Sequence, residues 1–172
     1  MDETFFLHSQ KGAKRLQRKP RKRGGKATKR GRSDEQVGVL VARDRSGATV
    51  DAVLPCFNRR TVQAVLAPVL QPDALLCSDG YSVYRAFAAH TGLAHEPVNL
   101  RAGIRVRGEV FHIQHVNAYH SRLKQWLRRF HGVATQHLPT YLGWFRWLDT
   151  HPAPLDPKRF LQAAAGMLPI NT

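Results

Sequence analysis

The chain has 172 residues, 42% of them hydrophobic, and carries a formal net charge of +15 with a sequence pI near 10.9. This length indicates one domain with its own core, and the charge predicts a polyanionic partner, with nucleic acid the first choice. The absence of an 18-residue apolar run and of a signal peptide argues against a membrane or secreted protein. The two cysteines, Cys56 and Cys77, are too few for a disulfide framework or a zinc site.

The first forty residues combine an apolar strand with a strongly basic segment. Residues 1–8 predict a β-strand, because Thr4 and two phenylalanines favour a pleated surface. Residues 11–33 hold twelve Lys or Arg and no Asp or Glu, so they cannot bury enough apolar surface to fold alone. We expect a mobile basic loop that grips DNA phosphates; a solvated loop without a role is the alternative. The candidate DNA-binding residues here are Lys14, Arg15, Arg18, Lys19, Arg21, Lys22, Arg23, Lys26, Lys29, Arg30 and Arg32.

Strand and helix patterns alternate through the rest of the chain. Apolar runs predict strands at 36–42, 48–56, 74–78 and 95–99, and helical spacing predicts helices at 59–70, 82–90, 117–130, 138–149 and 158–167. Asn58 and Asn117 are the expected N-caps of two of these helices, and Pro68 predicts a kink or an early end in the first. Residues 1–150 form the expected domain, and 151–172 a C-terminal extension without an assigned role.

This order of elements is typical of an α/β, RNase H-like fold. In such a fold a mixed central sheet is flanked by helices, and here the basic loop is inserted after the first strand. Leu75-Leu76-Cys77 predicts a buried strand that ends in Ser78-Asp79-Gly80. Asp79 then lies at the C-terminal tip of a strand, where open α/β sheets bind ligands. The alternative is that Asp79 only caps the helix that follows.

Three short motifs, in this order and spacing, resemble the insertion-sequence transposases of the DDE group with an ISXO-like domain. They are Asp2-Glu3-Thr4, Ser78-Asp79-Gly80-Tyr81 with Tyr84, and His115-Val116-Asn117 with His120-Ser121. Leu123-Lys124, Arg129-Phe130-His131-Gly132-Val133 and Tyr141-Leu142-Gly143-Trp144 fit the same pattern. The resemblance spans the chain to about residue 150.

The resemblance implies an RNase H-like catalytic domain that cleaves and transfers DNA strands at transposon ends with two Mg²⁺ or Mn²⁺ ions. It also implies DNA as partner, a homo-oligomer on that DNA, and a cytoplasmic, nucleoid-associated bacterial protein. Carried over by position, Asp2 and Asp79 match the two catalytic, metal-binding aspartates. His120 stands where many members carry the third ligand, a glutamate, and others His or Asn. Lys124 shares a helix face with His120, Arg128 extends that face, and both are expected to contact DNA.

Several assignments have alternatives. The alternative for Asp2 is a frayed terminal residue, and the alternative for His120 is an ordinary polar residue of the helix. Glu109 is a substitute for the third carboxylate, and His112 or His115 is an alternative metal ligand. Asn117 is a supporting residue, and the aromatic side chains of 138–149 favour a core over a base-stacking platform.

The start of the chain and its charge leave other functions open. Because Asp2 directly follows Met1, we expect a truncated catalytic domain that lacks an N-terminal DNA-recognition region. A non-catalytic basic DNA-binding remnant and a ribosomal or nucleoid-type protein also explain the charge. A nuclease of the same fold uses the same ligands, with water in place of a 3′-hydroxyl as nucleophile.

Overall fold

The computed structural model describes residues 1–16, 18–19, 24–29, 33–98, 106, 111–151 and 156–166. Its elements in chain order are β1 (Asp2–Leu7), β2 (Gln36–Arg43), β3 (Thr49–Leu54), α1 (Arg59–Leu66), β4 (Leu75–Ser78), α2 (Ser82–Thr91), β5 (Ala94–Pro97), α3 (Gln114–Arg128), the 3₁₀ turn η2 (Thr135–His137), α4 (Leu138–Thr150) and α5 (Pro157–Ala164). Within these ranges, no helix is both long and apolar enough to cross a bilayer.

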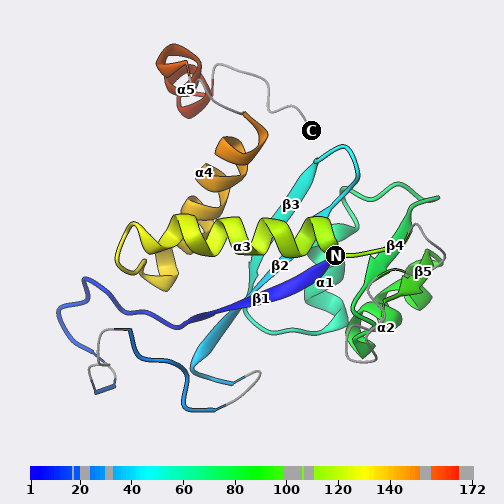
Figure 1. The fold of residues 1–172 in the computed structure, drawn as a ribbon. Helices are drawn as coiled ribbons and strands as arrows, with labels where there is room; N and C mark the ends of the chain where they lie inside the picture. The colour runs from blue at the N-terminus through cyan, green and yellow to red at the C-terminus, as the bar shows by residue number, and fades with distance from the viewer. Residues whose placement is uncertain are drawn as a thin grey trace.

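The strands form two small sheets. β1, β2 and β3 pair antiparallel in that order, and β4 pairs parallel with β5. The two sheets meet where the amino group of Met1 donates to the carbonyl oxygen of Cys77 at 2.5 Å, which brings the start of β1 to β4 (Figure 1). The expected mixed α/β architecture is therefore present, but its antiparallel and parallel pairings lie in separate sheets and not in one continuous sheet.

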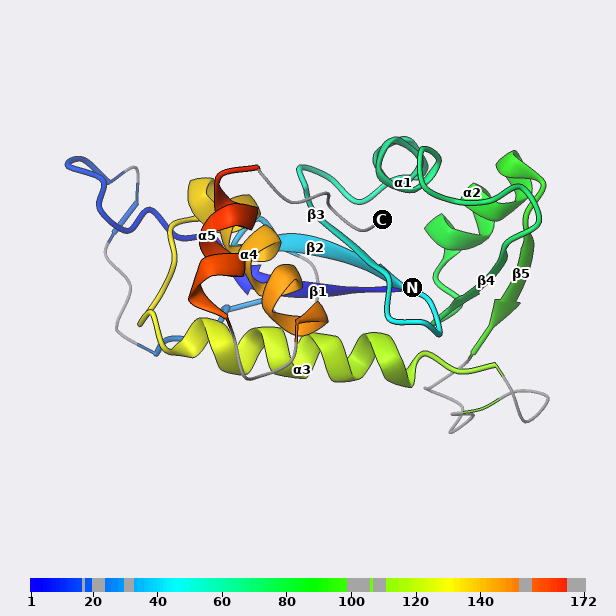
Figure 2. The ribbon, with the colours of Figure 1, turned by 90° about the horizontal axis from the view of Figure 1, so that it is seen from above.

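Helices cover both faces of the three-stranded sheet. Side chains alternate along a strand, so Val39 and Val41 pack toward α3 and α4, whereas Leu40 between them packs toward α1 and α2. Figure 2 shows α3 on one side of the sheet and α1 on the other. β1 and α3 run side by side in the same direction in both views, and this arrangement positions the candidate site.

The helix boundaries confirm one predicted cap and correct another. Asn58 caps α1 through a capping box with Thr61, and α1 ends two residues before Pro68. Asn117, by contrast, is wrong as an N-cap, because α3 already begins at Gln114 and the Asn117 N–H donates to the carbonyl of Ile113. Ile113 is buried at the helical spacing of the α3 stripe, so packing extends the helix backward past the asparagine.

A buried polar network ties α3 and α4 to the sheet. The side chain of Asp51 in β3 is fully buried, accepts a hydrogen bond from the Tyr119 hydroxyl at 2.5 Å, and pairs with Arg146. Nearby, Asp149 of α4 pairs with Arg43 of β2 at 2.7 Å. Burying carboxylates is tolerable only with such partners, so the network fixes α3 against the three-stranded sheet.

Candidate active site

Asp79 lies in the tight turn that follows β4. Its Oδ1 accepts a hydrogen bond from the Tyr81 N–H at 3.0 Å, and the buried Ser78 hydroxyl accepts one from the Gly80 N–H at 3.2 Å. Gly80 has a φ of 81°, a conformation that favours glycine. The N-cap of α2 is Tyr81 and not Asp79. The turn therefore holds the carboxylate at the strand tip, ahead of the helix.

The carboxylates of Asp2, Glu3 and Asp79 converge at the junction of the two sheets. One oxygen from each lies within 4.8 Å of the other two. Within the described residues, this is the one group of three His, Cys, Asp or Glu side chains that lie so close together. Asp2 is not a frayed terminal residue, because it pairs with Val41 in the sheet. The acidic cluster, as we call these three carboxylates, thus joins the two predicted aspartates and adds Glu3.

Glu3 was not predicted as a site residue. Neighbouring residues of a strand point to opposite faces, so alternation alone places Glu3 away from Asp2. The hydroxyl of Tyr84, in the first turn of α2, donates to Glu3 Oε2 at 2.6 Å. The Asp2-Glu3-Thr4 motif was the one sequence signal for Glu3. At the start of β1 the carboxylates of Asp2 and Glu3 both reach Asp79, although the two side chains leave opposite faces of the strand.

His120 of α3 approaches the same cluster. Its Nδ1 lies 4.0 Å from Asp2 Oδ2, and its side chain is 9% exposed. Its Nε2 is buried and has no hydrogen-bond partner among the described residues. The structure therefore brings the two predicted aspartates together and places His120 beside Asp2, outside the group of side chains that meet within 4.8 Å.

The electrostatics of the site follow from burial and like charges. Burial first, then the neighbouring Glu3 and Asp79, raise the pKa of Asp2 to about 7. Burial first, then the nearby Lys124, lower the pKa of His120 to about 4. The carboxyl of Asp2 thus resists ionisation although the Met1 amino group and Lys124 lie near it, and the imidazole beside it is neutral.

The remaining candidates lie at different distances from the cluster. Lys124 is electrostatically coupled to both Asp2 and His120, as expected from its place one turn after His120. Arg128 and Lys124 are exposed on α3, and Asn117 is half-buried near its start. His112 and His115 stack with ring centroids 5.1 Å apart and do not belong to the cluster, and Glu109 lies outside the described residues.

The basic segment begins beside the end of α3. The Lys11 ammonium donates to the carbonyls of Phe130 and Gly132 at 3.0 and 2.8 Å. The base of the loop is closed by a hydrogen bond of 2.7 Å from the His8 N–H to the Glu35 carbonyl. Lys14, Arg15, Lys19, Lys26 and Lys29 are exposed and Arg18 is half-buried, while Arg21, Lys22, Arg23, Arg30 and Arg32 lie outside the described residues.

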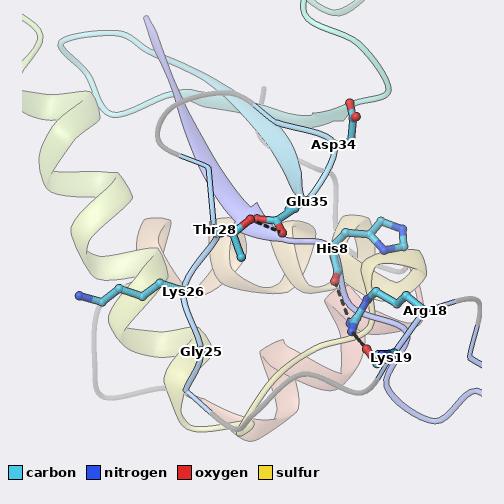
Figure 3. A pocket seen from close by; sticks show the side chains of 8 residues that line it. All are labelled: His8, Arg18, Lys19, Gly25, Lys26, Thr28, Asp34 and Glu35. Carbon is cyan, nitrogen blue, oxygen red and sulfur yellow. Dashed lines mark hydrogen bonds between the residues drawn. The ribbon is translucent and has the colours of Figure 1, made fainter.

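A shallow hollow of about 580 Å³ separates part of this loop from the ends of β1 and β2 (Figure 3). Arg18 donates to the carbonyl of His8 there, and the Thr28 hydroxyl donates to Glu35 at 2.9 Å. The lining residues are His8, Arg18, Lys19, Gly25, Lys26, Thr28, Asp34 and Glu35. The hollow lies at the opposite end of β1 from Asp2, about 20 Å away at the usual rise of a strand.

Comparison with known protein families gives one match. The model of the ISXO2-like transposase domain matches residues 1–148. The chain therefore belongs to that transposase family, whose general activity is DNA transposition and whose partner is DNA. Searches of curated proteins and of solved structures gave no match.

Proposed function

We propose that this domain carries out metal-dependent phosphodiester cleavage and strand transfer on DNA at the ends of an insertion sequence. The convergence of Asp2 and Asp79 carries the proposal, because residues 77 positions apart in sequence present carboxylates within 4.8 Å of each other. Half-buried like charges oppose folding, so a fold that gathers them favours a functional explanation.

The donor set of the site fits divalent metal ions. Mg²⁺ and Mn²⁺ prefer carboxylate oxygens, and Asp2 and Asp79 supply them, with His120 as an adjacent nitrogen donor. Burial and the neighbouring Glu3 and Asp79 raise the pKa of Asp2, and a bound cation would lower it again. Bound ions of this kind supply an activated nucleophilic oxygen and stabilise charge during an in-line displacement at phosphorus.

The strand order supports an RNase H-like arrangement. β3-β2-β1 and β4-β5 meet at the hydrogen bond between Met1 and Cys77, so the five strands follow the order 3-2-1-4-5 across the junction. Asp2 then lies at the start of β1 and Asp79 directly after β4, the two strands that meet at the junction. Acidic residues presented by central strands support the proposed RNase H-like catalytic domain.

A track of positive side chains runs from the acidic cluster to the basic loop. Lys124 and Arg128 follow His120 by one and two helical turns, about 6 and 12 Å along α3. α3 ends beside Lys11 at the base of the loop. DNA lying along this track would place one phosphate at the cluster while the loop holds phosphates roughly six base pairs away, at 3.4 Å per step.

The test is metal-dependent nicking of supercoiled plasmid DNA, together with joining of a labelled duplex bearing a free 3′-hydroxyl to that plasmid. We expect both products in Mn²⁺ or Mg²⁺, and neither for Asp79→Ala. Asp73→Asn, which removes an exposed carboxylate of the loop before β4, is the matched control and should retain activity.

The products distinguish the rival functions. Nicks without joined product would identify the domain as a nuclease that uses water as the nucleophile. DNA binding without either product in both metals would assign a non-catalytic DNA-binding domain and refute the proposal. Oligomerisation on DNA is the accompanying expectation, and sedimentation of the protein with and without the labelled duplex measures it.

A further inference from the structure

The acidic cluster holds one carboxylate more than the two predicted aspartates supply. Glu3 contributes a third carboxylate from β1, the same strand that carries Asp2. Opposite oxygen ligands of one octahedral Mg²⁺ lie about 4.2 Å apart. The 4.8 Å spacing of the cluster therefore lets all three carboxylates reach shared ions with small side-chain rotations.

Tyr84 holds the Glu3 carboxylate in place. Its hydroxyl donates to Oε2 at 2.6 Å, and the Tyr84 side chain is fully buried in the core between α1 and α2. A tyrosine hydroxyl is uncharged at neutral pH, so it acts as a neutral donor. A neutral donor orients a carboxylate without cancelling its charge, as the residues behind metal ligands do.

The buried imidazole of His120 points to a ligand at the same place. Its residue is 7% exposed, its Nδ1 faces Asp2, and its Nε2 has no partner among the described residues. An imidazole cannot replace the negative charge of the glutamate that many relatives carry there, but it can donate a lone pair. The third negative charge of the site therefore comes from β1.

The geometry points to Glu3 as the third carboxylate ligand of this site, positioned by Tyr84, with His120 as a neutral nitrogen donor beside it. This inference rests on the metal site of the proposed function and assigns it a different third acid. Imidazole suits Mn²⁺ better than Mg²⁺, so the same arrangement favours Mn²⁺.

The test measures metal binding and not activity. Free Mn²⁺ is followed by its electron paramagnetic resonance signal during titration of the metal-free protein. We expect Tyr84→Phe to weaken Mn²⁺ binding about tenfold and Glu3→Gln to weaken it more. Glutamine keeps an acceptor for the Tyr84 hydroxyl, so Glu3→Gln removes the charge with little change of shape. Asp73→Asn is the matched control and should bind Mn²⁺ as wild type does.

The outcomes separate this inference from the proposed function. Wild-type affinity in Glu3→Gln, together with lost binding in Asp79→Asn, would overturn the role of Glu3 and leave the metal site standing. Absence of Mn²⁺ binding by the folded wild type would overturn both. If circular dichroism shows that Glu3→Gln does not fold, Tyr84→Phe decides, because unchanged affinity there contradicts a positioned Glu3 ligand.

Discussion

The imidazole of His120 lies against the carboxylate of Asp2 where α3 passes the start of β1, with Nδ1 4.0 Å from Oδ2. Opposite charges at this distance would form an ion pair, but burial lowers the pKa of the imidazole to about 4 and raises that of the carboxyl to about 7. At neutral pH the histidine is therefore uncharged and gives Asp2 no positively charged partner.

Replacing His120 by glutamate should shift the metal preference of the site toward Mg²⁺. His120→Glu adds a fourth carboxylate next to Asp2, so the metal-free protein should lose about 1–3 kcal/mol of stability. Added Mg²⁺ should then raise its melting temperature more than it raises that of wild type. Thermal unfolding in EDTA, Mg²⁺ and Mn²⁺ measures this. The exposed His115→Glu on the same helix is the control, and equal Mg²⁺ shifts in both variants would contradict the prediction.

Neutralising Asp2 should stabilise the metal-free fold. Asp2→Asn keeps the size and the acceptor oxygen of the side chain but removes a half-buried charge beside Glu3 and Asp79. We expect a gain of about 1–3 kcal/mol in the free energy of unfolding by urea in EDTA, with Mn²⁺ no longer adding stability. Asp73→Asn should stay within about 0.5 kcal/mol of wild type. A destabilised Asp2→Asn would show that the carboxylate is held by favourable contacts.

Removing the Tyr119 hydroxyl should weaken the attachment of α3 to the sheet. Tyr119→Phe deletes the 2.5 Å hydrogen bond to the buried Asp51 and leaves that carboxylate with one donor fewer. The expected loss is about 1–3 kcal/mol, measured by urea unfolding. Tyr141→Phe, in the aromatic cluster of α3 and α4, is the matched change, and an equal loss there would assign the effect to the removal of a hydroxyl in general and not to the bond with Asp51.

Removing positive charge from the basic loop should weaken DNA binding and make it less dependent on salt. Lys14→Ala with Arg15→Ala should lower the slope of log affinity against log salt by about 0.9 for each phosphate that the loop no longer neutralises. Lys158→Ala with Arg159→Ala, an equal change on exposed positions of α5, is the control. Fluorescence anisotropy on a labelled duplex at several salt concentrations gives both slopes, and identical slopes would remove the loop from the DNA interface.

The sequence predicts the position of Asp79 because local rules decide it. A short apolar run followed by Ser-Asp-Gly specifies a strand that ends in a tight turn, and Gly80 takes the positive φ that the turn requires. Asn58 is equally local, since its capping box involves Thr61 three residues on. Such features depend on neighbouring residues alone.

Glu3 and Asn117 could not be predicted correctly because tertiary contacts decide them. Strand alternation separates Glu3 from Asp2, and only the meeting of β1 with β4 and the Tyr84 hydroxyl bring it to the cluster. The capping preference of Asn117 yields to the burial of Ile113, which starts α3 earlier. The way the two sheets meet likewise depends on a tertiary contact, the hydrogen bond between Met1 and Cys77.

Because the base of the basic loop is closed, the length of the loop does not affect the geometry of the acidic cluster. The chain leaves β1 at His8 and re-enters β2 after Glu35, and one backbone hydrogen bond joins these two points. Lengthening such a loop twofold adds only about 0.6 kcal/mol of closure entropy and leaves Asp2 opposite Val41. A longer or shorter loop would thus change how far the basic side chains extend from the domain, while the three carboxylates stay where they are.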